Sequence, residues 1–412
     1  MTTRKCRHCD TPLRHSFADL RTSPLANSYL TADDLHRMEP FYPLHALVCD
    51  KCLLVQLEHS ASPQEIFSHY LYFSSYSDSW LSHASAYADL MTASLSLGRE
   101  SLVIEIGSND GYLLRFFQQK GIPVLGIEPA GNVAAVARER GIDTRVEFFG
   151  QACASALTRE GKLADLVVGN NVLAHVPDIN DFVKGLTVVL RPGGVATMEF
   201  PHLLRLMEQV QFDTIYHEHF FYFSLLAVDG IFRGHGLAIY DVEELPTHGG
   251  SLRIYARHAT DCPGSGSVSP RVSGIIQRER QAGLHTMETY ATFSEKVKET
   301  KRRLLECLIR IKAGGKSIVA YGAPAKGNTL LNYCGIGTDF LDYTVDRSPH
   351  KQGHYLPGTR IPIHHPDRIR ETQPDYVLIL PWNLTEEISQ QMAHIRDWGG
   401  MFIVPIPEPL IF

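Results

Sequence analysis

Short apolar runs alternate with amphipathic stretches along most of the 412-residue chain. The apolar run from Ser101 to Gly107 predicts a buried strand, which continues through a turn at 108–111 into a helix over 112–119. The same alternation recurs downstream, where further strands are predicted over 123–128, 163–169 and 195–200. Strands that alternate with helices in this way are typical of a doubly wound α/β sheet.

The last third of the chain has the same organisation without sequence repetition. A polar stretch over 260–270 and a long helical region over 271–312 precede a strand at Ser317–Gly322. A loop over 323–328 then leads into a helix over 329–333, and later strands are predicted over 343–346, 376–380 and 401–404. This pattern predicts a second Rossmann-like sheet, and the alternative is a degenerate sheet kept only for packing.

The first part of the chain differs from both sheets. Alternating apolar and polar residues over 41–58 predict a small hairpin, and an amphipathic helix is predicted over 79–97. A chain of 412 residues exceeds the usual size of one core. We therefore expect three units, with boundaries at residues 1–68, 69–245 and 246–412.

The charge and hydropathy of the chain argue against nucleic-acid and membrane partners. The chain has 39 basic and 45 acidic residues and a formal net charge of -6, so it lacks the basic surface expected for a nucleic-acid partner. This balance argues against a zinc-containing RNA-binding protein, which is the most remote alternative. No apolar run has signal-peptide or membrane-spanning length. We expect a cytoplasmic protein without a membrane partner.

The cysteines are unevenly distributed. Cys6 and Cys9 form one C-x-x-C pair, Cys49 and Cys52 form a second, and the other four cysteines are scattered singly. Two such pairs supply the four thiolates that a tetrahedral structural Zn²⁺ site prefers. A redox pair or buried reduced cysteines are the alternatives.

The predicted sheet brings several polar residues to the carboxyl ends of its strands, where open α/β sheets bind ligands. The turn after the first strand has the pattern E-x-G-x-x-x-G, which is not the dinucleotide fingerprint G-x-G-x-x-G, and its N–H groups can meet a carboxylate. An acidic residue ends the next strand, where such folds bind ribose hydroxyls. The candidate ligand-binding residues are Glu105, Gly107, Asn109, Asp110, Gly111, Glu128, Asn170 and Asn171.

Two further segments carry candidate chemistry. Tyr216, His217, Glu218 and His219 gather groups that can transfer protons near neutral pH, although a metal site or a structural polar cluster is also compatible with the pattern. The segment 70–77 is rich in tyrosine and serine. It is either an aromatic docking strip between domains or a substrate-binding wall.

The order of these motifs resembles class I S-adenosylmethionine methyltransferases, through the turn at 105–111, Glu128, the segment N-V-L-A-H-V-P-D at 171–178 and L-R-P-G-G at 190–194. Over nearly the whole chain it further resembles the sugar C-methyltransferases that act on nucleotide-linked 4-keto-deoxyhexoses. That second resemblance rests on the four-cysteine module, Y-x-Y-F-S-S at 70–75, Y-H-E-H-F at 216–220 and Y-G-A-P-A-K-G-N at 321–328.

The resemblance implies an α/β protein with a small N-terminal zinc-binding module, a central class I methyltransferase domain and a C-terminal Rossmann-like domain. S-adenosylmethionine and structural Zn²⁺ are the expected cofactors. A carbon beside a ketone becomes nucleophilic only after it loses a proton, so a base and an oxyanion donor are needed. His219 is the expected base, and the other expected catalytic residues are Glu218, Tyr216, His175 and Tyr70.

The substrate implied by the resemblance is a sugar linked to dTDP or another nucleoside diphosphate, methylated at C3. Methylation at C5 and, more distantly, O- or N-methylation of a small metabolite are the alternatives. The last domain is expected to grip the diphosphate, and the chain is expected to be a monomer or a simple homo-oligomer. The expected substrate-binding residues are Tyr72, His217, Lys326, Asn328, Arg347 and Lys351.

Overall fold

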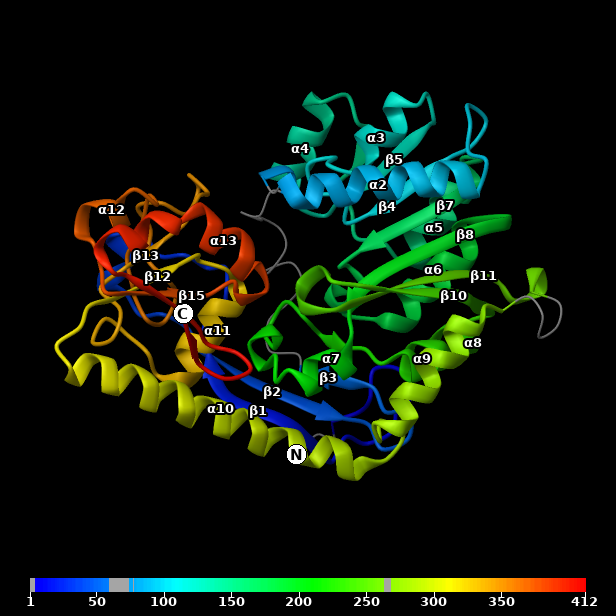
Figure 1. The fold of residues 1–412 in the computed structure, drawn as a ribbon. Helices are drawn as coiled ribbons and strands as arrows, with labels where there is room; N and C mark the ends of the chain where they lie inside the picture. The colour runs from blue at the N-terminus through cyan, green and yellow to red at the C-terminus, as the bar shows by residue number, and fades with distance from the viewer. Residues whose placement is uncertain (1–3, 59–73, 77, 263–267) are drawn as a thin grey trace.

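Three β-sheets organise the chain in a computed structural model that describes residues 4–58, 74–76, 78–262 and 268–412. Figure 1 shows the central sheet beside the C-terminal sheet, with the N-terminal strands beneath both. Within the described residues, no helix is both long enough and apolar enough to cross a membrane.

The N-terminal sheet contains a strand from far along the chain. Its order is β1-β2-β3-β9, and all its pairs are antiparallel. The strands span β1 (His15–Ser23), β2 (Tyr42–Val48), β3 (Val55–Leu57) and β9 (Phe221–Tyr222). Strands β2 and β3 form the hairpin that was predicted over 41–58. Because β9 directly follows the segment 216–220, the histidine-rich segment is anchored to the N-terminal sheet.

The central sheet has seven strands in the order β10-β11-β8-β7-β4-β5-β6. Its parallel part is β4 (Val103–Ile106), β5 (Val124–Ile127), β6 (Thr144–Arg145), β7 (Ala164–Asn170) and β8 (Leu190–Pro201). An antiparallel edge is added by β10 (Leu237–Leu245) and β11 (Ser251–His258). Strand β11 thus completes this sheet, although it lies beyond the boundary expected at 245/246.

Helices cover both faces of the central sheet because alternate side chains of its strands point to opposite faces. Val103 packs with α2 (Asp78–Ser94) and α3 (Leu114–Gln119), whereas Ile104 packs with α5 (Gln151–Arg159) and α6 (Ile179–Val189). The central part of the chain has three further helices: α4 (Gly131–Glu139), α7 (Leu203–Glu208) and α8 (Leu225–Gly234). The sheet is therefore doubly wound, as the sequence predicted.

The chain leaves the middle of this sheet in two directions. From β4 it runs outward through β5 to β6, and it then crosses to β7 and β8 on the other side of β4. The switch point lies between β4 and β7, and ligands of open α/β sheets bind outside the carboxyl ends of strands at such a point.

The C-terminal sheet has its own switch point. Its order is β14-β13-β12-β15-β16-β17, so the chain reverses direction between β12 and β15. The strands are β12 (Ile318–Tyr321), β13 (Thr344–Val345), β14 (Ile363–His364), β15 (Tyr376–Ile379), β16 (Met401–Val404) and β17 (Leu410–Ile411). The helices that accompany them are α11 (Ala325–Cys334), α12 (Arg368–Thr372) and α13 (Thr385–Gln391).

Two helices connect the sheets where one helical region was predicted over 271–312. They are α9 (Pro270–Gln281) and α10 (Met287–Ala313), and Gly283 between them has a φ of +84°. Figure 1 shows α10 running along β1. The rings of Phe17 and Phe293 stack there with centroids 4.5 Å apart. The N-terminal sheet, α10 and the C-terminal sheet share one hydrophobic core, so the N-terminal module is built into the larger structure.

Candidate active site

A cavity of about 860 Å³ lies where the three parts of the chain meet. Asn27 lines it from the N-terminal part, the loops after β4 and β7 line it from the central sheet, and the loops after β12 and β15 line it from the C-terminal sheet. Both switch points therefore open on the same cavity. Its volume lies in the upper part of the range of about 300–1,000 Å³ that is typical of small-molecule and cofactor sites.

The two loops at the central switch point are in contact. Gly107 ends β4 with a φ of +65°, and a Cβ at this position would lie 2.6 Å from a methyl group of Val172 in the loop after β7. Glycine is needed here because any other side chain would push the loops apart. Asn109 in the first loop and Asn170 and Asn171 at the second all line the cavity, as expected for ligand-binding residues.

Glu128 is fixed at the cavity wall after β5. Its Oε2 accepts a hydrogen bond from the N–H of Asn109 at 2.9 Å, and its Oε1 accepts one from the N–H of Ala130 at 2.8 Å. Burial raises the pKa of this carboxyl and the two N–H groups lower it, and the result is a pKa of about 6. A carboxylate held in this place can accept hydrogen bonds from ribose hydroxyls.

Three other candidate residues, one on β4 and two in the loop after it, lie outside the cavity lining. Glu105 on β4 is buried, and burial raises the pKa of its carboxyl well above the usual value. Asp110 forms an ion pair with Arg140 at 3.0 Å. Gly111 has a φ of +77°. These three residues are not part of the cavity lining, whereas Gly107 and Asn109 are.

His219 lies on the cavity wall between two hydrogen-bond partners. Its Nδ1 is 2.9 Å from the carbonyl oxygen of Thr214, and its Nε2 is 2.9 Å from the hydroxyl of Tyr216. A carbonyl oxygen only accepts, so Nδ1 carries the ring hydrogen and Nε2 has the lone pair. The ring of His175 is 4.7 Å away, edge to face. The arrangement leaves Nε2 as the basic atom beside the Tyr216 hydroxyl.

The surroundings keep His219 neutral. Burial lowers the pKa of His219 well below 6.5, and the nearby His175, His248 and Lys326 lower it further, while the bond to Thr214 raises it. Burial also lowers the pKa of His175 and of His248 to about 4. All three imidazoles line the cavity, so a neutral base is available there near pH 7.

The neighbours of His219 in the sequence face elsewhere. His217 points away from the cavity lining, with Nε2 3.2 Å from the carbonyl oxygen of Pro43. Glu218 accepts a hydrogen bond from the side chain of Asn27 at 2.5 Å. The ring of His219 is held at Nδ1 by the carbonyl oxygen of Thr214. The bend of the chain, which is neither strand nor helix here, separates the three side chains.

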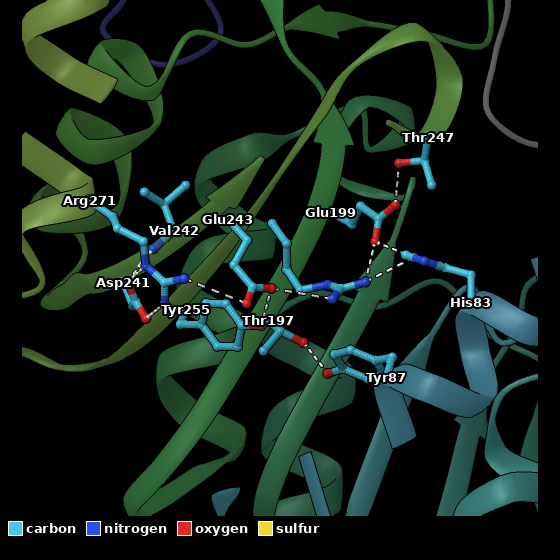
Figure 2. A network of polar contacts seen from close by, with 11 residues as sticks. His83, Tyr87, Thr197, Glu199, Asp241, Val242, Glu243, Thr247, Tyr255 and Arg271 are labelled. Carbon is cyan, nitrogen blue, oxygen red and sulfur yellow. Dashed lines mark hydrogen bonds and ion pairs between the residues drawn. The ribbon is translucent and has the colours of Figure 1, made fainter. Parts of the chain in front are cut away.

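A buried polar network supports the wall of the cavity, and Figure 2 shows it from close by. Glu199 on β8 accepts hydrogen bonds from His83 at 3.0 Å, from Arg253 at 2.7 Å and from Thr247 at 2.7 Å. His83 and Thr247 line the cavity, and His83 stacks on Trp80 with centroids 5.1 Å apart. Sequence reasoning missed these residues. The available signal was Glu199, an acid inside the apolar strand predicted over 195–200.

The C-terminal part of the chain contributes two lysines to the cavity lining. Lys326 lines the cavity, and its Nζ donates to Oδ1 of Asn383 at 2.7 Å. Lys351 also lines it, and its Nζ donates to the carbonyl of Ala323 at 2.9 Å. Asn328 is buried outside the lining, where it donates to Ala26 at 2.5 Å, and Arg347 is exposed and 3.9 Å from Glu387. Tyr70 and Tyr72 lie outside the described residues.

Four cysteines form a cluster at the base of the N-terminal part. The sulfur atoms of Cys6, Cys9, Cys49 and Cys52 all lie within 4.8 Å of one another. The sulfurs of Cys6 and Cys52 are 3.5 Å apart, as are those of Cys9 and Cys49. This spacing fits four thiolates around one tetrahedral ion with bonds of about 2.3 Å. Four protein ligands leave no open position, so the ion has a structural role.

Family models match three consecutive parts of the chain. Residues 6–67 match a model described as "Putative zinc binding domain", residues 80–242 match a methyltransferase domain, and residues 246–407 match a C-methyltransferase C-terminal domain. The N-terminal match contains all four clustered cysteines.

A curated C-methyltransferase is similar to the chain over nearly its whole length. The chain is 37% identical over 408 residues to the C-methyltransferase NovU of Streptomyces niveus, covering 99% of this chain and 96% of that protein. It is 30% identical over 94 residues to a ubiquinone biosynthesis O-methyltransferase of Bordetella avium (strain 197N), covering 22% of this chain and 39% of that one. A solved S-adenosylmethionine-dependent methyltransferase of Clostridium acetobutylicum ATCC 824 aligns with 12% identity and a TM-score of 0.36, covering 43% of this chain and 92% of that one.

Proposed function

The chain belongs to the C-methyltransferase family and is an S-adenosylmethionine-dependent C-methyltransferase, and on that premise we propose that it methylates a nucleotide-linked 4-keto-deoxysugar at the carbon beside the ketone. The observation that supports this proposal most directly is His219. It is a buried, neutral imidazole with Nε2 as its basic atom, on the wall of a cavity that both switch points share.

The central half of the cavity fits the methyl donor. Gly107 and Asn109 offer close backbone approach at the switch point, and Glu128 is held where ribose hydroxyls bind in such folds. Bound S-adenosylmethionine supplies an electrophilic methyl group on a sulfonium centre. The protein has to provide a carbon nucleophile, and that need explains why a base stands in the same cavity.

The proposed step begins with removal of a proton. Nε2 of His219 takes the proton from the carbon beside the ketone, and the electron pair of that C–H bond moves to the carbonyl oxygen as an enolate forms. The hydroxyl of Tyr216 lies 2.9 Å from the same nitrogen. When the sugar binds, this hydroxyl can donate its hydrogen bond to the substrate instead. The enolate carbon would then take the methyl group as the S–CH₃ bond breaks, its electron pair would stay on sulfur as a neutral thioether, and the ketone would be restored. His219 afterwards releases its proton to solvent.

The C-terminal half of the cavity is the proposed place for the nucleoside diphosphate. Lys351 lines the cavity near the carboxyl end of β12, and a lysine there can contact a phosphate. Arg347 and Asn328, expected to share this task, are outside the lining, whereas Lys326 and Lys351 both line the cavity. We propose Lys351 as the phosphate contact. C3 is the position that we propose for the new methyl group, and C5 is the other carbon beside a C4 ketone.

Hydrogen exchange tests this function. A panel of nucleotide-linked 4-keto-deoxysugars would be incubated with the protein in D₂O, with and without S-adenosylmethionine, and followed by mass spectrometry and NMR. We expect deuterium at one carbon beside the ketone without the donor, and a methyl group at that carbon with it. The position of the label distinguishes C3 from C5. A panel in which no sugar gains deuterium or methyl would overturn the proposal, provided that calorimetry still shows donor binding.

A further inference from the structure

Lys326 stands at the switch point of the second sheet, opposite the methyl-donor site. It is the second residue of α11, just after the loop that follows β12, and its partner Asn383 lies in the segment after β15. Gly322 in the loop after β12 has a φ of +91°, and a Cβ there would lie 2.6 Å from Cδ of Pro381. Glycine thus allows the two loops to come together, and the Lys326–Asn383 hydrogen bond spans the junction.

The ammonium group of Lys326 faces the cavity in an orientation that its neighbours fix. Its Nζ donates to Oδ1 of Asn383 at 2.7 Å and lies 4.7 Å from the centre of the Trp382 ring. An ammonium has three hydrogens, so Asn383 leaves donor capacity for a ligand in the cavity. The contact with the ring face favours the charged form of the lysine.

The positive charge of Lys326 lies close to the proposed base. The same cavity is lined by Lys326, His219 and His248, and the ammonium lowers the pKa of both histidines, after burial as the main cause. Burial lowers the pKa of Lys326, and the buried carboxylate of Asp213 raises it. Oδ2 of Asp213 accepts a hydrogen bond from Nε1 of Trp382 at 2.7 Å. Lys326 therefore lies in the same cavity as the base, with Asp213 as the acid that favours its charged form.

Lys351 differs in these respects. Its Nζ lies 3.8 Å from Asp346 and donates to the carbonyl of Ala323, and it is 5.4 Å from the centre of the Tyr29 ring. Its ion-pair partner Asp346 is a carboxylate, which compensates much of its charge. The two lysines are thus placed for different tasks, one beside the histidines and the other beside Asp346.

We propose that Lys326 is a catalytic residue that binds the substrate's ketone oxygen and stabilises the negative charge that develops on it. This inference rests on the function proposed above, and it reassigns Lys326 from the diphosphate to the reacting end of the sugar. While His219 removes the proton from carbon, the ammonium of Lys326 donates a hydrogen bond to the oxygen and keeps its own protons. When the carbon–methyl bond forms, the ketone returns and the hydrogen bond weakens. A donor aimed at developing charge in a site shielded from water contributes strongly to rate.

The test separates chemistry from binding. Lys326→Met removes the charge and keeps most of the side chain's volume, and Lys298→Met on the exposed surface of α10 is the matched control. Deuterium exchange in the absence of S-adenosylmethionine reports proton removal, and calorimetry with the nucleotide-sugar reports binding. We expect Lys326→Met to slow exchange by about 100-fold or more, with less than a tenfold change in sugar affinity. The control should keep both values.

Several outcomes would contradict the inference. Normal exchange by Lys326→Met, or loss of sugar binding with exchange unchanged at saturation, would assign Lys326 to the diphosphate or to packing. If Lys326→Met does not fold, Lys326→Gln is used in its place, and we expect the same loss of exchange. Added methylammonium must then restore part of the exchange for the inference to stand. Absence of exchange in the unaltered protein would overturn the proposed function instead, so the two failures are distinguishable.

Discussion

The side-chain nitrogen of Asn27 lies 2.5 Å from Oε1 of Glu218, although 191 positions separate the two residues. Asn27 comes from the N-terminal part, and Glu218 comes from the histidine-rich segment of the central part. The hydroxyl of Tyr29 is 3.2 Å from Oδ1 of Asn27 and donates to the carbonyl of Ala323 at 2.6 Å. Asn27 and Tyr29 therefore connect the histidine-rich segment with the loop after β12 in the C-terminal sheet.

Replacing Asn27 should impair turnover without affecting donor binding. In Asn27→Ala the Glu218 carboxylate loses a buried partner, and we expect kcat to fall about tenfold, which corresponds to about 1.4 kcal/mol. Asn27→Asp should be worse, because two carboxylates would face each other. Steady-state kinetics with both substrates varied, and calorimetry with S-adenosylmethionine, measure the two effects. Equal kcat values in the unaltered protein and both variants would show that this contact is dispensable.

His219→Asn should abolish turnover while S-adenosylmethionine still binds, because the ring acts on the acceptor. Tyr216→Phe removes the hydroxyl beside Nε2 and keeps the ring, so it should lower kcat less, by about 10–100-fold. Calorimetry and turnover assays on both variants check these expectations. If His219→Asn lost donor affinity as fully as activity, the segment would be structural.

The acid limit of the reaction should lie at low pH. A base works in its neutral form, and burial lowers the pKa of His219 well below 6.5. As pH falls, the neutral form therefore persists below the pH at which an exposed histidine becomes protonated, and exchange at saturating sugar should stay level through pH 6.5. Deuterium exchange measured across pH would show this. A decline centred at or above pH 6.5 would mean that His219 is not held neutral as described.

Removing a cysteine ligand should release the metal. Cys49→Ser leaves three thiolates, and we expect metal content to fall well below about one ion per chain, together with a lower Tm. Cys262→Ser, at a cysteine outside the cluster, is the control and should retain the metal. Elemental analysis and thermal unfolding measure both properties. A fully loaded Cys49→Ser protein with an unchanged Tm would remove these cysteines from the site.

Local patterns in the sequence predicted the elements that strand periodicity controls. Strands β4, β5, β7, β12, β15 and β16 are short buried runs with distinct boundaries, and they were predicted in nearly the right places. The cysteine pairs predicted a cluster because each pair is a local turn and four thiolates suit one ion. The turn at 107–109 and Glu128 were predicted because the carboxyl ends of parallel strands meet at one edge.

Long-range contacts could not be derived from such patterns. Strand β9 is only Phe221–Tyr222, and it pairs with β3 across more than 160 residues of chain. Glu218 stands next to His219 in the sequence, yet its carboxylate accepts a hydrogen bond from Asn27. His83 and Glu199 occupy an amphipathic helix and an apolar strand, where neither residue belongs to a motif. Such partners are determined by packing between the three parts of the chain.

The last prediction concerns the network around Glu199. Burial raises the pKa of this carboxyl, but His83, Arg253 and Thr247 lower it more strongly, to about 2 from an ordinary 4.5. Since the folded-state pKa is the lower one, the stabilisation is present above about pH 4.5 and is lost as pH falls toward 2. The difference corresponds to about 3 kcal/mol.

Glu199→Gln should therefore destabilise the protein by about 3 kcal/mol at pH 7, because the buried Arg253 loses its closer anionic partner and keeps only the longer ion pair with Glu243 at 3.5 Å. Near pH 3 the difference should shrink to about 1.4 kcal/mol, since Glu199 is then largely protonated in the unfolded chain although it is still mostly ionised in the folded protein. Denaturant unfolding at the two pH values measures the difference. Glu408→Gln removes an exposed acid that pairs with Arg303, and it should change stability by less than about 1 kcal/mol at either pH. If Glu199→Gln behaved like Glu408→Gln at pH 7, the network would line the cavity without stabilising the fold.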